Sequence, residues 1–210
     1  IVASGDGEET AALALELGSS AEIGAGIALS GGIRLKASDL FVDGAMNADG
    51  GPLVAESSSS VFVRADCSDI AAGICDASIS RPPDPDGVEA AVLVTNASSL
   101  DAEGLSIFGG PTVIGFTSTG ILHGSSAETV VAAPYSVLRL QEGSKIDAAI
   151  CESVATLSRI EILGFAGETF RPQDLNVTIG TFGGMFEPIF DIAASCVVDD
   201  NGPVASSLPF

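Results

Sequence analysis

Short apolar runs that alternate with polar residues, and that end at small polar clusters, constrain this chain more than any other feature. In the stretch 33–65, Leu35 stands between Arg34 and Lys36, which is the period of two expected for a strand with one dry and one wet face. The runs are short and their ends lie close together, so no room is left for helices between them. The stretch therefore predicts repeated strands joined by turns.

Clusters of Gly, Ser and Asp mark the ends of these runs. Because these residue types favour turns, we expect a turn at each cluster. The same rhythm resumes over residues 88–140. The clusters in the first part of the chain fall at residues 30–32, 38–39, 49–51 and 57–60.

Two segments leave a helix open as the alternative to a strand. In residues 10–17, leucines alternate with Ala and Glu, which predicts a strand, but these residues are also good helix formers and a short capping helix is the rival. Residues 146–155 are the second place where a helical turn fits. The clearest alternating strands of the chain are residues 159–163 and 175–179.

The strand pattern predicts one all-β domain over residues 1–210. A parallel β-helix is favoured, because strands separated by short turns stack into coils of roughly twenty residues whose interior suits Val, Ile, Leu and Ala. An antiparallel β-sandwich or jelly roll with the same strand count is the alternative. Within the domain we expect an N-terminal extended segment 1–20, a Pro-rich loop 81–87 and a C-terminal tail 203–210.

The stretch 33–65 resembles the repeats of secreted parallel β-helix proteins of the pectin-lyase-like and filamentous-adhesin type. The resemblance is one of strand and turn rhythm, carried by the alternating runs and by the Gly, Ser and Asp clusters between them. It implies a solenoid of stacked coils in a secreted protein.

Acidic residues outnumber basic residues by a wide margin and exclude whole classes of partner. The chain has 28 Asp and Glu against 8 Lys and Arg, a formal net charge of −20, and its lysines are Lys36 and Lys145. Because a phosphate backbone needs clustered Lys and Arg, nucleic acid is excluded as a partner, and anionic membranes and polyuronates are disfavoured. The mean hydropathy is +0.45. No run of about 18 apolar residues occurs, so we expect no membrane span.

The four cysteines predict disulfides rather than a metal site. Cys67, Cys75, Cys151 and Cys196 lack the C-x-x-C spacing of zinc ligands, and the chain has a single histidine. Of the three possible connectivities, Cys67–Cys75 with Cys151–Cys196 is the simplest. Disulfides indicate an extracellular or cell-surface location.

Two triplets match the acceptor pattern for N-glycosylation. They begin at Asn96 and Asn176 and continue with a Ser or Thr two positions later. We expect glycosylation at both asparagines, which also places the protein outside the cell.

The sequence names no catalytic residue. His123 is the single histidine, and a catalytic triad would need Ser125 or another serine brought beside it. No Gly-x-Ser-x-Gly motif is present. Pairs of carboxyl groups, which glycosidases use, are guaranteed by number among 28 acids and carry no signal. We therefore expect a protein that is not an enzyme.

Two acidic loops contain candidate calcium ligands. Asp84, Asp86 and Glu89 surround one turn-forming Gly, and Asp199 and Asp200 precede another. Calcium binds oxygen ligands that gather within one loop, although neither loop matches the twelve-residue EF-hand pattern. We expect no required cofactor, with calcium as the candidate ion.

These observations favour an extracellular structural protein that assembles with copies of itself into a filament or a surface layer. The extended segments 10–17 and 204–210 are candidates for donated strands that pair with the sheet edge of a neighbouring copy.

A carbohydrate-binding or carbohydrate-active β-helix protein of the cell surface is the alternative function. Its partner would be a surface polysaccharide, and it predicts converging acids beside an exposed aromatic platform. Tyr135 and the ten Phe residues are the aromatics available for that platform.

Overall fold

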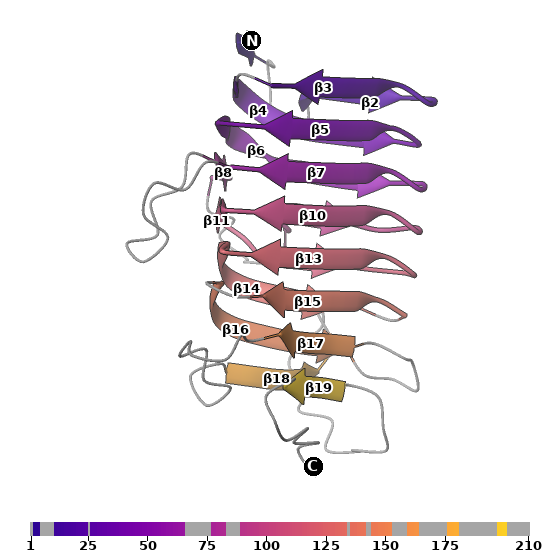
Figure 1. Ribbon diagram of the computed structural model, residues 1–210, viewed down its shortest axis with the longest axis vertical. Helices are drawn as coiled ribbons and strands as arrows, with labels where there is room; N and C mark the ends of the chain where they lie inside the picture. Colours follow the sequence, from indigo (N-terminus) through magenta and orange to yellow (C-terminus); the bar gives the residue numbers. More distant parts are fainter. Residues whose placement is uncertain are drawn as a thin grey trace.

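Strands stacked coil upon coil along one axis form a parallel β-helix, which is the architecture that the sequence favoured (Figure 1). The described residues contain strands and no helix, and every pairing between their strands is parallel. The antiparallel sandwich and the jelly roll are therefore wrong. The structure is a computed structural model that describes residues 2–4, 11–24, 26–65, 77–82, 89–133, 135–141, 144–152, 159–163, 176–180 and 197–200.

One wall of the solenoid is an eight-stranded sheet, here called sheet B. Each of its strands comes from a different coil and pairs with the strands of the coils above and below it (Figure 1). In chain order the strands are β3 (Ser20–Ile23), β5 (Asp39–Asp43), β7 (Ser60–Arg64), β10 (Ser99–Glu103), β13 (Thr119–His123), β15 (Val137–Gln141), β17 (Arg159–Leu163) and β19 (Val197–Asp200).

The other two walls belong to an eleven-stranded sheet, here called sheet A. Its long strands each pair with two shorter strands, so each long strand runs along one wall, bends and continues along the next. Its strands are β1 (Val2–Ser4), β2 (Ala11–Glu16), β4 (Ile27–Lys36), β6 (Met46–Glu56), β8 (Ala77–Ser80), β9 (Val92–Val94), β11 (Leu105–Phe108), β12 (Thr112–Ile114), β14 (Ser126–Ala132), β16 (Lys145–Glu152) and β18 (Asn176–Gly180).

The helical alternatives at residues 10–17 and 146–155 are wrong where the structure describes them. Residues 11–16 form β2, and residues 145–152 form β16. The alternating pattern therefore outweighs helix propensity, because each strand gains its hydrogen bonds from a neighbouring coil. The described residues also form no helix of the length and hydropathy that a membrane crossing requires.

Glycine pairs bend the long strands, and two of the predicted turns are wrong for this reason. Residues 30–32 and 49–51 lie inside β4 and β6, whose register shifts between Gly31 and Ile33. A Cβ atom at Gly51 would lie 2.3 Å from the backbone nitrogen of Gly32, so the two bends stack closely. The turns predicted at 38–39 and 57–60 do fall at breaks between strands, which span residues 37–38 and 57–59, while Asp39 and Ser60 already begin β5 and β7.

The substitution Gly51→Ala tests this close approach. Its methyl group would meet backbone atoms rather than a movable side chain, so we expect a loss of about 1–3 kcal/mol in the free energy of unfolding. Gly24→Ala is the matched control, because no atom lies within 4 Å of its added Cβ. Urea unfolding of both variants measures the difference. Equal stability of the two variants would contradict the stacked bends.

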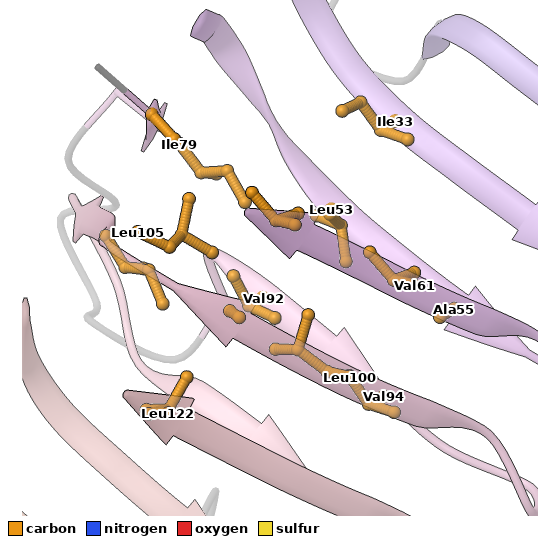
Figure 2. Close-up of a cluster of buried hydrophobic side chains, with 14 of the residues drawn as sticks. Ile33, Leu53, Ala55, Val61, Ile79, Val92, Val94, Leu100, Leu105 and Leu122 are labelled. Atoms are coloured by element: carbon orange, nitrogen blue, oxygen red, sulfur yellow. The ribbon is translucent and has the colours of Figure 1, made fainter. Parts of the chain in front are cut away.

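The core consists of columns of side chains that point inward from successive coils. Leu40, Val61 and Leu100 stand in register on β5, β7 and β10, and none is more than 2% exposed. Gly120 takes the corresponding place on β13, because the side chain of Ile114 fills the space that a Cβ would need. Figure 2 shows this packing between the sheets. Each fully buried Leu or Val contributes about 1.5–3 kcal/mol.

A ladder of buried serines runs along the corner that leads into sheet B. The Ser38 N–H donates to Ser59 Oγ at 3.2 Å, the Ser59 N–H to Ser98 Oγ at 3.1 Å, and the Ser98 N–H to Ser118 Oγ at 3.2 Å. The hydroxyls of Ser38, Ser59 and Ser118 also donate to a carbonyl of their own turn, as Ser59 does to Glu56 at 2.7 Å. All four serines are at most 2% exposed. The serine hydroxyls therefore form hydrogen bonds with backbone N–H and C=O groups at the corner, where the sheet ladders are interrupted.

The same corner holds all nine non-glycine residues with positive φ in the described chain. Each lies within the two positions before a serine of the corner. A left-handed conformation costs roughly 1–2 kcal/mol for a residue with a Cβ, so the corner must be held by its surroundings. These residues are Leu17, Ala37, Ser57, Ser58, Asn96, Ala97, Phe116, Thr117 and Tyr135.

The substitution Ser59→Ala tests the serine ladder. It removes the acceptor of the Ser38 N–H and the donor to the Glu56 carbonyl, and an unsatisfied buried group costs about 1–3 kcal/mol. Ser60→Ala, at the adjacent exposed position of β7, is the control and should change stability by less than about 0.5 kcal/mol. Thermal and urea unfolding measure both. A Ser59→Ala protein as stable as the control would show that the ladder contributes nothing.

Candidate functional site

The outward side chains of β5, β7, β10 and β13 form three columns on the face of sheet B that looks away from the core. Parallel pairing places one residue of each coil beside the next, so each column runs along the solenoid axis. All these side chains are exposed or half-buried. We call them the outer face: Asp39, Ser60, Ser99 and Thr119 in the first column, Phe41, Phe62, Asp101 and Ile121 in the second, and Asp43, Arg64, Glu103 and His123 in the third.

Two phenylalanines stack at the centre of the outer face. The ring centroids of Phe41 and Phe62 are 4.8 Å apart and the rings are parallel within 1°. The guanidinium carbon of Arg64 lies 5.5 Å from the Phe62 centroid. Because the ring faces turn toward each other and toward the guanidinium, the pair presents an apolar ridge rather than a flat aromatic platform.

Charged groups surround Glu103 in the third column. Arg64 Nε lies 3.3 Å from Glu103 Oε2, and His123 Nδ1 lies 3.9 Å from Glu103 Oε1. The side chains of this cluster are between 39% and 57% exposed, so solvent screens these pairs and each contributes little to stability. The cluster therefore sets the local charge of the face more than it holds the fold together.

Asp101 is a half-buried carboxyl group in the central column of the outer face. Burial raises the pKa of Asp101 above its ordinary value, and the charge of Glu103 raises it further. Arg64 and His123 lower the pKa but do not cancel the first two causes. A carboxyl group in this position gains from any cation that comes close to it.

Ser125 lies outside any pairing with the His123 ring. The Ser125 hydroxyl accepts a hydrogen bond from the Leu105 N–H at 3.1 Å. It also lies within hydrogen-bond distance of the carbonyl oxygens of His123, at 3.0 Å, and Ala102, at 3.2 Å. Since Ser125 is 1% exposed, it is a corner serine like those of the ladder on the other side of sheet B. The serine considered as a nucleophile is thus engaged with the backbone.

The first calcium candidate lies mostly outside the described residues. Asp84 and Asp86 fall there, and Glu89 forms an ion pair with Arg81. In the part of the chain that the structure describes, no group of three or more His, Cys, Asp or Glu side chains is arranged to hold a metal ion. Calcium binding at this loop stays a prediction.

The second calcium candidate lies in a strand rather than a turn. Asp199 and Asp200 belong to β19 and stand in register with Glu161 and Ile162 of β17. The turn expected over residues 199–202 is therefore wrong for these two positions, because the ladder of sheet B extends through them.

The disulfide prediction also stays a prediction. Cys67, Cys75 and Cys196 lie outside the described residues. Cys151 lies in β16, with its backbone in register between Ala132 and Ile179.

The two glycosylation candidates occupy different surroundings. Asn96 is exposed at the left-handed corner, with φ of 56°. Ser98, the third residue of its triplet, is 2% exposed and belongs to the serine ladder. A glycosylating enzyme that recognises both Asn96 and Ser98 therefore has access to the Ser98 hydroxyl in the unfolded chain. Asn176 is the first residue of β18.

The N-terminal coil leaves its strand edges and part of its interior open. Among the described residues, β2 pairs with β4 alone and β3 pairs with β5 alone. Leu13 and Leu15 stand in register with Ile33 and Leu35, which are at most 1% exposed, yet both leucines are only partly buried. Leu17 at the adjoining corner is 86% exposed. Among the described residues, no further coil covers the apolar side chains of this coil.

Comparison of the chain with protein-family models, with curated proteins and with solved structures gave no match.

The substitution Asp101→Asn tests the electrostatics of the outer face. The folded protein holds the Asp101 proton more tightly than the unfolded chain does, because the folded-state pKa is raised above 3.8. Stability therefore falls as the pH rises from 3.8 through the folded-state pKa, and the loss persists at neutral pH.

Since Asn cannot ionise, we expect the Asp101→Asn protein to be more stable than the wild type at neutral pH. The gain should vanish below pH 3.8, where the carboxyl group is protonated in both states. Urea unfolding across the pH range measures it. A variant that is less stable at neutral pH, or a difference that does not change with pH, would contradict the assignment.

Proposed function

We propose that the protein is an extracellular structural protein whose copies stack end to end into a filament or layer. The single observation that carries this proposal is the N-terminal coil, where Leu13 and Leu15 occupy core columns and no coil among the described residues covers them. Terminal coils of solenoids need either a polar cap or a partner, because each coil buries its apolar side chains against the next one.

A second copy of the same chain is the partner that fits this end. The last coil of another copy has parallel strands with the same spacing, so its backbone can continue the ladders of β2 and β3. Such a contact joins one end of the solenoid to the other end. A head-to-tail contact of this kind repeats without closing and generates a filament.

The described chain favours stacking over strand donation. Residues 10–17 are the first predicted donor strand, but β2, which lies within them, is already hydrogen-bonded to β4 of its own chain. Its outer edge remains available to another chain, while its inner edge does not. The second predicted donor, residues 204–210, lies outside the described residues.

The net charge of −20 makes assembly dependent on salt. Like-charged copies repel one another at low ionic strength, and salt at physiological concentration screens charges beyond about 8 Å. We infer that assembly strengthens from low to moderate salt. The acidic, Lys-poor composition and the predicted disulfides support the extracellular setting.

The substitution Ala14→Pro tests the open edge. The Leu17 N–H donates to the Lys36 carbonyl of the neighbouring coil at 3.0 Å, and since successive N–H groups of a strand alternate in direction, that of Ala14 points to the open edge. Proline removes this donor without breaking the pairing of β2 with β4. We expect assembly to be lost while the unfolding midpoint changes little.

Ala14→Val is the matched control, because it keeps the N–H and suits a strand. Sedimentation velocity and negative-stain electron microscopy at moderate salt measure assembly for both variants. Filaments of unchanged length from the Ala14→Pro protein, or a wild-type protein that stays monomeric at every salt concentration, would refute the proposal.

A further inference from the structure

An apolar ridge on the outer face lies between two polar columns. Phe41, Phe62 and Ile121 occupy the central column, and Asp101 stands between Phe62 and Ile121. Phe41 is 36% exposed. A solvent-facing strand position needs no apolar side chain, and exposed apolar groups that gather beside polar rows mark a binding surface.

The charge of the outer face complements a cation. Within these four strands the one guanidinium, Arg64, is shared with Glu103, and His123 approaches the same carboxyl group. In the adjoining coils, Glu22 of β3 stands in register with Phe41 and Arg139 of β15 with Ile121. Within the four strands, four carboxyl groups thus face one guanidinium, and a polyuronate would be repelled. The four acids are Asp39, Asp43, Asp101 and Glu103.

An ammonium ligand would stabilise the ionised form of the Asp101 carboxyl group. Its pKa is raised first by burial and then by the charge of Glu103. A cation beside the ridge would offset both causes and would also contact the apolar neighbours of Asp101. A purely neutral ligand would leave this carboxylate uncompensated.

Hydroxyl groups line the other side of the ridge with a regular spacing. Ser60, Ser99 and Thr119 stand in register on three successive coils. Neighbouring strands lie about 4.7–4.9 Å apart, so these hydroxyls repeat at that interval along the axis. A ligand that matches them must itself carry hydrogen-bonding groups at regular intervals.

The backbone of the outer face has no free N–H or C=O groups with which a peptide strand could pair. β5, β7, β10 and β13 each pair with a neighbouring strand on both sides, so their N–H and C=O groups are already used. Extended peptides add to open sheet edges through such groups, and amphipathic helices need a groove. Recognition here depends on side chains alone, which favours a ribbon-like polymer that lies flat on the face.

We propose that the outer face of sheet B binds an amine-bearing polysaccharide that lies along the solenoid axis across β5, β7, β10 and β13. Its C–H groups pack on the ridge of Phe41, Phe62 and Ile121, and its ammonium groups meet Asp101 and the neighbouring carboxylates. Its hydroxyl groups bond to the row that begins at Ser60. This binding is independent of end-to-end stacking, because it uses a wall of the solenoid and not its end.

The experiment is isothermal titration of the full-length protein with a deacetylated chito-oligosaccharide in mildly acidic buffer. The N-acetylated oligomer of the same length and an oligolysine of the same charge are the comparison ligands. We expect the deacetylated oligomer to bind more tightly than either one, because only this oligomer combines amines, hydroxyls and an apolar sugar surface.

Two variants place the binding on the outer face. Asp101→Asn keeps the shape of the side chain and should weaken the deacetylated oligomer about tenfold, and Phe62→Ala should also weaken it. Glu128→Gln and Phe108→Ala are the matched controls, because both side chains are exposed on sheet A. Both controls should bind like the wild type. Since Asp101→Asn is expected to be at least as stable as the wild type, loss of binding in it is not loss of fold.

Four results would overturn the proposal. They are equal binding of the acetylated and deacetylated oligomers, equal or tighter binding of oligolysine, unchanged affinity in Asp101→Asn, and no binding of any oligomer. Each of these results leaves end-to-end stacking untouched, because filament formation is measured separately by sedimentation.

Discussion

The parallel hydrogen-bond ladder between successive coils is the interaction on which the rest of this structure depends. It fixes the distance between coils and places one residue of each coil beside its counterpart in the next. Whatever occupies a position is therefore repeated along a column. Leucines and valines stack in the core, glycines stack at the bends of sheet A, and serines stack at the corner that enters sheet B. The left-handed residues before those serines are held by the same repetition.

This ladder also explains why functional chemistry lies at two places. A ladder has ends, and at the N-terminal end of the described chain core leucines are only partly buried and a further coil would cover them. A ladder also has faces, where outward columns present the same spacing of groups again and again. The ridge of Phe41 and Phe62, with Asp101 beside it, comes from strands that are distant in sequence and adjacent in space. The end suits another copy of the chain, and the face suits a periodic polymer.

The all-β class and the coil architecture could be predicted because alternation and turn chemistry are local signals. The exact coil period could not be read as easily. Ser38 and Ser59 are 21 positions apart and Ser98 and Ser118 are 20 apart, but Ser59 and Ser98 are 39 apart. This long coil interrupts the period. The Gly pairs were misread as turns, because bends that stack on one another have the same composition as turns. A serine directly before every strand of sheet B except β19 is the signal of the register that the sequence analysis did not use.

The outer face could not be predicted for a related reason. Arg64 and Glu103 meet through the register of β7 and β10, and no spacing rule relates two residues on either side of a long coil. His123 is the single histidine of the sequence, and the fold places it beside Glu103. Once the serine of each coil is aligned, all three columns follow from counting along the strands.

Fibre diffraction from oriented filaments of the native protein tests the central claim most directly. If copies stack end to end, the strands lie across the filament and their spacing of about 4.8 Å gives a reflection along the filament axis. The axial repeat measured from the same pattern should then equal a whole number of strand spacings for each copy, because no gap separates one copy from the next. A strand reflection perpendicular to the axis would mean that the solenoids associate side by side, and it would contradict the role of the open coil.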